Sequence, residues 1–358
     1  MEVKLGDVFI ISSGGTPDKS ENSYYENGNI AWIKTGDLKG KYISKDVDFI
    51  TEKGLQNSSA KLFPINTVLV AMYGATIGAC SILPFEASTN QACAAFLPIS
   101  NVLPEYLYYF LCSQKAKFIK DGVGGAQPNI SAGYLKKVSF EVKSLSEQQQ
   151  IVDVLNKVEK LINNRNKQLA KLDELVKARF VEMFGDYDLS HAKDDWKLIS
   201  EIGKVVGGAT PKTNIEEYWD GEYRWITPAE LSADSGYIYD SVRKLTKAGV
   251  ESCSLQEMPI DTVILSSRAP IGKVAIAGST FYCNQGFKNI ICNEEILPRY
   301  LYTVLLLNTE YLNSLGRGAT FKEISKSIVE SIKIPVPSIE LQKNFTTFVE
   351  QVDKSKFL

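Results

Sequence analysis

The sequence predicts an α+β protein made of two tandem mixed α/β domains that are separated by long antiparallel coiled-coil helices, with approximate two-fold symmetry. Three observations lead to this prediction. The 358 residues exceed what a single hydrophobic core usually organises. One ordered set of short phrases occurs twice along the chain. Each copy of that set leads into a segment with helical periodicity, and the first such segment, residues 145–184, contains neither proline nor glycine.

The repeat keeps its register through seven blocks. The phrase "SGGTPDKSENSYYENGNIAWIKTGDL" at Ser13 matches "VGGATPKTNIEEYWDGEYRWITPAEL" at Val206, and "NTVLVAMYGATIGA" at Asn66 matches "DTVILSSRAPIGKV" at Asp261. Corresponding positions stay 193 to 195 residues apart from the first block to the last. Chance similarity would not hold this register, so the sequence indicates an internal duplication.

Each copy begins with a mixed α/β domain, predicted at residues 1–143 and, together with a linker, at 186–337. The β-branched, apolar runs "INTVLVAMYG" and "DTVILSS" predict strands in the two domains. The segments "PEYLYYFLCSQKAKFIK" and "PRYLYTVLLLNTEYLNSL" predict helices that open with proline in the first turn.

A long helix is predicted at 144–185 and a shorter C-terminal helix at 338–358. Ser144 and Glu147 fit a capping box, and Gly185 supplies the stop. About forty residues at roughly 1.5 Å each make a rod of roughly 60 Å. Apolar residues alternate three and four apart, which is the spacing of a coiled-coil stripe. The residues predicted to pair the two helices are Ile151, Leu155, Val158, Ile162, Leu169, Leu172, Val176, Phe180, Phe345, Phe348 and Val352.

Composition argues against catalysis and against metal binding. The only histidine, His191, lies in a polar linker-like stretch, so a zinc site or a Ser-His-Asp triad is not expected. The chain has no Pro-Pro dipeptide and no GxGxxG, which a stand-alone adenine methyltransferase would need. Acid-x-Lys triplets at 141–143 and 195–197 are common by chance, and neither lies in a repeated block with a second acid placed nearby, so they do not indicate a nuclease.

The charge and cysteine content describe an ordinary globular protein of a reducing compartment. The net charge is −2 and the pI is near 5.8, which counts mildly against nucleic-acid binding without excluding a local basic patch. The six cysteines include no CxxC pair and read as free thiols. No apolar run reaches the length of a membrane helix, and no secretory signal opens the chain, so a cytoplasmic protein is expected.

With these motifs the sequence resembles the specificity subunit of Type I restriction–modification systems. The match is carried by "GGTP" and "GGATP", "AWIKTGDL" and "RWITPAEL", "GATIG" and "APIGK", and "SLSEQQQIV" and "PSIELQKNF". The resemblance implies two target-recognition domains on an antiparallel pair of helices, without catalytic activity of their own. It also implies a bipartite, asymmetric target in double-stranded DNA, two methyltransferase subunits and, in some assemblies, two restriction subunits. S-adenosylmethionine, ATP and Mg are then expected in those partners and no cofactor in this chain.

A duplicated DNA reader explains why the phrases repeat while the letters between them differ. Two identical halves would read a palindrome, whereas diverged halves read two different half-sites about one helical turn apart. Because the second helix is the shorter one, Leu169, Leu172, Val176 and Phe180 are expected to lack an internal cover. We expect a methyltransferase subunit or a second copy of the chain to cover them. A duplicated scaffold that binds protein or glycan without DNA is the alternative.

The candidate DNA contacts are polar residues on glycine-flanked loops that differ between the copies, because such side chains match base edges and phosphates. They are Lys19, Lys34, Tyr73, Thr76, Gln127 and Asn129 in the first copy, and Lys212, Thr213, Arg268, Lys273, Thr320 and Lys322 in the second.

Residues that are identical in both copies are expected to be structural. Asn90-Gln91 and Asn284-Gln285 are predicted to be buried turn amides. Trp32 and Trp225 are predicted to anchor the cores. The glycine pairs 14–15 and 207–208 are predicted to form turns.

Overall fold

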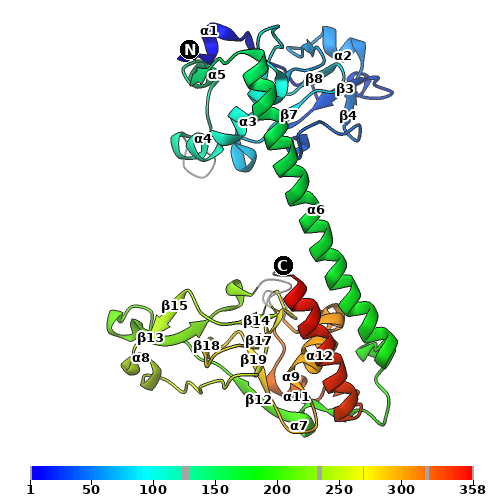
Figure 1. Cartoon of the computed structure of the whole chain (residues 1–358), viewed down its shortest axis with the longest axis vertical. Helices are drawn as coiled ribbons and strands as arrows, with labels where there is room; N and C mark the ends of the chain where they lie inside the picture. The colour runs from blue at the N-terminus through cyan, green and yellow to red at the C-terminus, as the bar shows by residue number, and fades with distance from the viewer. Residues whose placement is uncertain (1, 123–128, 232–235, 269, 319–321, 357–358) are drawn as a thin grey trace. The chain divides into compact units, whose positions relative to one another are not determined.

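The computed structural model describes residues 2–122, 129–231, 236–268, 270–318 and 322–356. The chain forms two compact units, Met1–Asn164 and Arg165–Leu358 (Figure 1). Helix α6, Leu145–Phe184, begins in unit 1 and ends in unit 2. Within the described ranges, no helix is both long and apolar enough to cross a membrane.

Unit 1 contains two four-stranded sheets and a two-stranded ribbon. The first sheet has the order β2-β9-β6-β7 and is antiparallel throughout, and the second has the order β4-β3-β8-β5 with a parallel β3–β8 pair. The strands are β1 (Glu2–Lys4), β2 (Ile11–Ser13), β3 (Ile30–Ile33), β4 (Asp48–Ile50), β5 (Leu62–Phe63), β6 (Val68–Ala71), β7 (Cys80–Ile82), β8 (Ala87–Thr89), β9 (Cys93–Phe96) and β10 (Ser139–Glu141). The helices are α1 (Leu5–Val8), α2 (Glu52–Gln56), α3 (Pro104–Ser113), α4 (Lys115–Asp121) and α5 (Ala132–Lys136), with short 3-10 turns η1 (Asn22–Tyr24), η2 (Thr35–Asp37) and η3 (Gly74–Thr76).

Unit 2 repeats this plan with a five-stranded and a three-stranded sheet. Their orders are β12-β19-β16-β17-β14 and β15-β13-β18, and β11 pairs with β20 as β1 pairs with β10. The strands are β11 (Lys197–Leu198), β12 (Gly203–Gly207), β13 (Trp219–Ile226), β14 (Tyr237–Ile238), β15 (Arg243–Leu245), β16 (Val263–Leu265), β17 (Val274–Ala277), β18 (Tyr282–Cys283), β19 (Lys288–Cys292) and β20 (Lys333–Ile334). The helices are α7 (Ile199–Ile202), α8 (Lys247–Glu251), α9 (Pro298–Leu307), α10 (Thr309–Ser314), α11 (Lys326–Glu330) and α12 (Ile339–Ser355), with turns η4 (Leu189–His191), η5 (Glu216–Tyr218) and η6 (Pro228–Glu230).

The backbone confirms the duplication that the sequence indicated. The predicted strands are β6 and β16, and each proline-led segment forms two helices instead of one, α3 and α4 in unit 1 and α9 and α10 in unit 2. Asn66 and Asp261, at matching positions before these strands, have φ values of 69° and 68°. A positive φ is unusual for a residue with a side chain, and Asn and Asp tolerate it best. The two domains therefore share local backbone conformation as well as element order.

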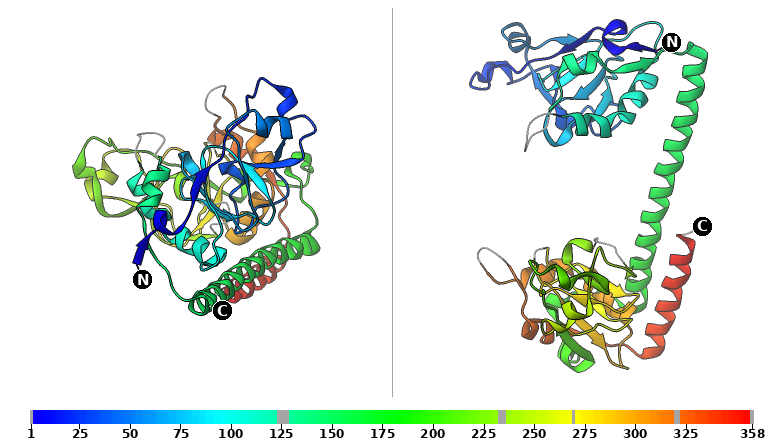
Figure 2. Two further views of the ribbon diagram at one scale, coloured as in Figure 1. Left: turned by 90° about the horizontal axis from the view of Figure 1, so that it is seen from above. Right: turned by 90° about the vertical axis from the view of Figure 1, so that its left-hand side faces the viewer.

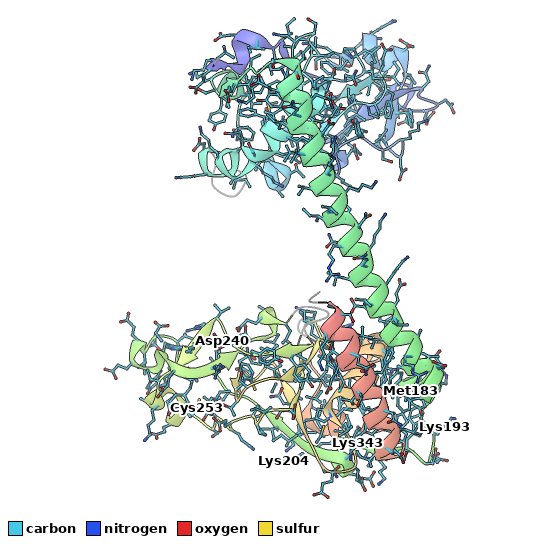
Figure 3. The ribbon with its side chains drawn as sticks, viewed as in Figure 1. Met183, Lys193, Lys204, Asp240, Cys253 and Lys343 are labelled. Atoms are coloured by element: carbon cyan, nitrogen blue, oxygen red, sulfur yellow. The ribbon has the colours of Figure 1, made fainter. Side chains whose placement is uncertain are left out.

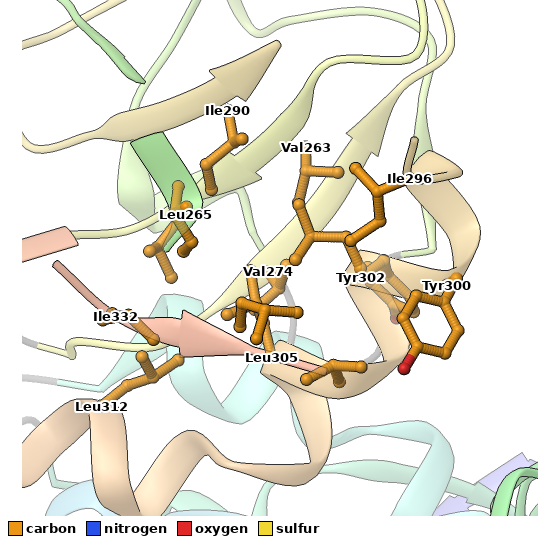
Figure 4. Close-up of a cluster of buried hydrophobic side chains, with 14 of the residues drawn as sticks. Val263, Leu265, Val274, Ile290, Ile296, Tyr300, Tyr302, Leu305, Leu312 and Ile332 are labelled. Atoms are coloured by element: carbon orange, nitrogen blue, oxygen red, sulfur yellow. The ribbon is translucent and has the colours of Figure 1, made fainter. Parts of the chain in front are cut away.

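Each domain has an apolar core between one of its sheets, β2-β9-β6-β7 in unit 1 and β12-β19-β16-β17-β14 in unit 2, and its helices. In unit 2 the core includes Val263, Leu265 and Ile290 from the sheet and Tyr300 and Leu305 from α9 (Figure 4). Figure 4 shows these side chains meeting between the strands and α9. The corresponding core of unit 1 joins β6, β7 and β9 to α3.

A buried glutamine joins each domain to the helix that follows it. In α6, Gln148 Oε1 accepts a hydrogen bond from Leu103 N at 2.8 Å, and its Nε2 donates to two backbone carbonyls. In α12, Gln342 makes the same three bonds, with Leu297 N at 2.8 Å as donor. Both side chains are completely buried, so these bonds satisfy backbone groups that water does not reach.

The long helix begins and ends as predicted. Ser144 N donates to the Glu147 carboxylate at 3.0 Å, and Glu147 N donates to the Ser144 hydroxyl at 3.3 Å. Gly185, which follows the last turn, has φ +90°. The capping box and the glycine stop are therefore confirmed.

Helix α12 packs antiparallel against the second half of α6, within unit 2 (Figure 2). Arg165 Nη2 donates to the carbonyl of Lys356 at 2.7 Å near the end of α12. The ring of Phe180 lies 5.4 Å from that of Phe345 near its beginning. Figure 3 shows Met183 of α6 and Lys343 of α12 on these neighbouring helices. The predicted pairing through Phe180, Phe345 and Phe348 is confirmed, with the Arg179 guanidinium 5.7 Å from the Phe348 ring centroid.

The expectation that the end of α6 lacks an internal cover is wrong. Phe180 is 1 % exposed and packs on Phe345 and Tyr300, and Val176 packs against the same core. Leu169 and Leu172 are half-buried. The physical reason is direction: α12 starts beside the end of α6, so its 17 residues cover that end.

Four exposed apolar residues of α6 lie close together in its first half, within unit 1, whereas Leu175 and Val181 in its second half are 47 and 42 % exposed. Val154, Val158, Leu161 and Ile162 are 58, 45, 67 and 55 % exposed. The prediction that Val158 and Ile162 pair with the second helix is wrong, because both are exposed and lie in unit 1. Ile151 is also a correction, because it packs on the core of unit 1. Leu155 is half-buried, and Val352, at 6 % exposure, is buried in α12.

Candidate nucleic-acid interface

In both domains the segment that contains the repeated glycines packs closely against the end of a strand, β8 in unit 1 and β18 in unit 2. We call this segment the Gly-Gly loop and the contact the support. Gly15 N donates to Thr89 O at 2.9 Å, and Ala209 N donates to Cys283 O at 2.9 Å. A Cβ at Gly14 would lie 1.9 Å from Thr89 O, and one at Gly208 would lie 2.0 Å from Cys283 O. These glycines are thus required for close approach of two segments, not for the turns that the sequence suggested.

The repeated Asn-Gln amides have the structural role predicted for them. Asn90 Oδ1 accepts from Ala92 N at 3.2 Å, and Asn284 Oδ1 accepts from Gly286 N at 2.9 Å. The next residues, Gln91 and Gln285, each accept a hydrogen bond from a threonine of the Gly-Gly loop. The asparagines are half-buried and the glutamines exposed, so the amides are less buried than expected.

The repeated tryptophans anchor apolar clusters on the sheets that contain β3 and β13, as predicted. Trp32 and Trp225 are 4 and 2 % exposed. Their indole nitrogens donate to Gly15 O at 3.0 Å and to Ala209 O at 3.1 Å. Because each indole holds the Gly-Gly loop, neither ring is available to stack on a base.

At the end of β6, three of the candidate residues of unit 1 come together. Tyr73 and Asn129 pair across an antiparallel bridge, next to the hydrogen bond from Ile130 N to Met72 O at 2.9 Å. Tyr73 is 44 % exposed and Asn129 is also exposed. Thr76 lies in the same loop and donates to Tyr73 O at 3.3 Å. Gln127 is outside the described residues.

At the end of β16, unit 2 forms the same bridge from charged residues. Arg268 pairs with Glu323, next to the hydrogen bond from Ile324 N to Ser267 O at 3.0 Å. Arg268 Nε donates to Glu323 Oε2 at 2.9 Å, and Lys288 Nζ lies 3.3 Å from Glu323 Oε1. We call Tyr73–Asn129 and Arg268–Glu323 the variable pairs, because they occupy matching positions with different residues.

Two cations hold Glu323 in its ionised form. Burial acts to raise the pKa of this carboxyl, but the hydrogen bonds and charges of Arg268 and Lys288 outweigh it and lower the pKa below the usual value. The carboxylate therefore fixes both cations at neutral pH.

The sequence did not single out Lys288, Glu323 or Arg317. Arg317 exchanges backbone hydrogen bonds with Glu323 at 3.0 and 3.1 Å, so it lies beside the variable pair. A comparison of the two repeats could have pointed to Lys288 and Glu323, because their counterparts in the first copy are Ala94 and Asn129, which carry no charge. The constant offset does not show, however, that Lys288 and Glu323 lie close to Arg268.

The other candidates are dispersed. Lys19, Lys212, Thr213 and Lys322 are exposed on loops, and Thr320 is outside the described residues. Lys34 Nζ lies 2.6 Å from the Asp48 carboxylate, whose hydrogen bond raises the pKa of the lysine. Lys273 is a correction: its Nζ donates to Leu231 O at 2.6 Å and to Pro228 O at 3.4 Å, so it supports the η6 loop.

The two variable pairs present side-chain donors and acceptors at matching places in the two domains. They can bind an anionic or polar partner. Across the described ranges, no group of three or more His, Cys, Asp or Glu side chains is placed to hold a metal ion. The chemistry that these residues offer is hydrogen bonding and charge pairing with base edges and phosphates.

A family model described as the Type I restriction modification DNA specificity domain matches residues 1–174 and 193–357. The MjaIX specificity subunit of Methanocaldococcus jannaschii is 42 % identical over 185 residues, which are 50 % of this chain and 43 % of that protein. The EcoR124I/EcoR124II specificity subunit of Escherichia coli is 28 % identical over 196 residues, 53 % of this chain and 48 % of that protein. The chain thus spans about half the length of these curated relatives.

Solved structures show the same fold. The S subunit of a Type I restriction-modification system from M. genitalium is 17 % identical with a TM-score of 0.56, covering 99 % of this chain and 90 % of that one. A chain from a study of complex assembly and conformational transition of the type I R-M system is 15 % identical with a TM-score of 0.58, at the same coverage. With its two matched segments and this fold, the chain belongs to the family of Type I restriction modification DNA specificity domains.

Proposed function

We propose that this chain recognises a bipartite, asymmetric sequence in double-stranded DNA, with one half-site read by each domain. The observation that carries the proposal is the pair of equivalent backbone bridges with different side chains, Tyr73–Asn129 and Arg268–Glu323. A support that both domains share, with different donors and acceptors on it, is what two readers of different sequences require. The family to which the chain belongs supports the same role.

The duplication accounts for an asymmetric target. A symmetric dimer reads a palindrome, because identical surfaces face both half-sites. Here the support repeats and the variable pairs differ, so the two half-sites differ in sequence. Two half-sites about one helical turn apart are expected for such a pair of readers.

The chain acts, in this proposal, by positioning two methyltransferase subunits and, where they occur, two restriction subunits. S-adenosylmethionine supports methyl transfer in the former, and ATP and Mg support the latter. The exposed apolar residues of α6, including Leu161 at 67 %, support a protein partner on the first half of this helix. This replaces the end of α6 as the expected docking surface, because α12 already covers that end.

A methylome tests the proposal directly. The chain is co-expressed with its cognate methyltransferase subunit in a host without DNA methylation, and modified adenines are mapped by single-molecule sequencing. We expect a split, asymmetric motif that disappears when the chain is omitted. Replacing residues 190–337 with the corresponding domain of another family member should change one half of the motif only. Methylation that persists without the chain contradicts the proposal and favours a scaffold that does not read DNA.

A further inference from the structure

Four charged residues meet at the variable pair of unit 2, and only Arg268 was foreseen. Glu323 lies between Arg268 and Arg317, because it forms an antiparallel bridge with each of them. Lys288 Nζ approaches from β19, 3.3 Å from Glu323 Oε1 and 3.3 Å from the buried Ser267 hydroxyl. Two cations contact the carboxylate, and Arg317 adds a third positive residue through its backbone pairing with Glu323, so the balance of charge is positive, which suits the neighbourhood of DNA phosphates.

The backbone pairing sets the direction of these side chains. Residues directly opposite each other on paired segments project from the same face. Arg268, Glu323 and Arg317 therefore share one face. Arg268 is 46 % exposed at its side chain, whereas Lys288 is only 13 % exposed. The arginine can reach a partner in solvent, and the lysine stays beneath it as a support.

The hydrogen bond to Glu323 leaves the end of the Arg268 guanidinium available. Nε donates to Glu323 Oε2 at 2.9 Å, and among the described residues neither Nη atom has an acceptor. The carboxylate thus restricts the rotation of the side chain through Nε, and no bond to a described residue engages its two terminal Nη donors. Two parallel donors held in this way match O6 and N7 of guanine in the major groove.

The matching position in unit 1 offers different chemistry. Tyr73 and Asn129 replace Arg268 and Glu323, and Ala94 replaces Lys288. No charge is present at these three positions. The Asn129 amide can donate and accept, which suits adenine rather than guanine.

We propose that Arg268 reads a guanine in the half-site of unit 2 and that Glu323, supported by Lys288, positions its guanidinium for this contact. The inference rests on the proposed DNA recognition and extends it to one residue and one base. Glu323 is a positioning residue, because it acts through Arg268.

The test compares motifs and affinities for the wild-type chain, Arg268→Lys, Arg268→Ala and Lys247→Ala, each with its methyltransferase subunit. Arg268→Lys keeps the charge but loses the two-donor fork. Lys247, on α8, is an exposed cation away from the variable pair and provides the matched control. Thermal unfolding of each variant shows whether it folds as the wild type does. Arg268→Lys keeps the positive charge at a half-exposed position, so we expect it to fold. It therefore keeps the test usable if Arg268→Ala is unstable.

We expect Arg268→Lys and Arg268→Ala to lose discrimination at one G·C position, in one half-site, by about 5- to 150-fold. The other half-site and Lys247→Ala should keep the wild-type motif. An oligonucleotide with 7-deazaguanine at that position lacks the N7 acceptor. It should weaken wild-type binding and leave the Arg268→Ala affinity unchanged.

Glu323→Gln separates positioning from general stability. Removing a negative charge near phosphate should raise affinity for all sequences at low salt, while the less constrained arginine loses discrimination at the same G·C position. If Glu323 had a purely structural role, Glu323→Gln would lower the affinity for all sequences and the discrimination at the G·C position together. That result would overturn the positioning role.

The remaining outcomes also decide the matter. If Arg268→Ala weakens binding equally for all sequences and Arg268→Lys restores it, Arg268 contacts phosphate and the proposal fails. An unchanged motif in both variants, or no G·C position in that half-site, also overturns it. If the wild-type complex shows no sequence preference at all, the proposed DNA recognition itself fails, which is a different result from a wild-type motif that ignores Arg268.

Discussion

Replacing Phe345 with alanine should destabilise unit 2 and release the second half of α6. Phe345 is completely buried, and its ring lies 5.4 Å from that of Phe180 and 5.7 Å from that of Phe184. Deleting a buried phenylalanine side chain costs about 3–5 kcal/mol, from lost burial and from the cavity that remains. For a unit of this size each kcal/mol lowers Tm by roughly 2–4 °C, so we expect a decrease of roughly 10 °C.

Calorimetry of the full chain measures this decrease, and hydrogen exchange locates it. Phe348→Ala is the matched control, because Phe348 lies one turn further along α12 and is only partly buried. Its loss should cost about 1 kcal/mol. Amides of residues 165–184 should exchange faster in Phe345→Ala, while those of residues 145–164 keep their protection. Equal effects of the two variants, or faster exchange along the whole of α6, would refute the antiparallel packing described here.

Three further predictions follow from the support and the surface of the two units. Gly14→Ala should lower the free energy of unfolding by about 1–3 kcal/mol or more, because the new Cβ would meet Thr89 O. Gly36→Ala is the control: a Cβ there would have nothing within 4 Å, so stability should change by less than about 0.5 kcal/mol. Denaturant unfolding measures both changes. Burial raises the pKa of Cys93 to about 12 and that of Cys283 to about 11, so iodoacetamide should leave both unmodified at pH 8 in the folded protein, as peptide mass spectrometry would show. Since their thiol pKa values are raised in the folded state, their contribution to stability should be complete below the unfolded pKa of about 8.5 and decline as the pH rises through 11 and 12. Leu161→Asp should weaken binding of the methyltransferase subunit at least ten-fold, measured by calorimetric titration or pull-down. Its Tm should fall by no more than about 2 °C. Unchanged binding would show that the first half of α6 is not a docking surface.

The local elements could be predicted because their signals are local. Proline at the first turn of α3 and α9, the capping box at Ser144 and Glu147, and Gly185 each act through neighbouring backbone. The duplication was readable for the same reason, since matched phrases give matched elements. Trp32 and Trp225 were also predictable, because a large residue repeated in both copies is usually kept for packing.

The sequence alone determined the duplicated mixed α/β plan, the long helix and the family, because periodicity, caps and repeated phrases are written in short stretches of chain. Only the tertiary structure decided which residues meet. The direction of α12 decided that Phe180 is covered and Leu161 is not, since a stripe of apolar residues does not state which part of it a shorter partner reaches. The pairing of 268 with 323 brought Arg268 and Glu323 together beside Lys288, and separate contacts with Pro228 and Leu231 made Lys273 a support for the η6 loop. Contacts between distant segments depend on sheet register and chain direction, which no local pattern in this sequence encodes.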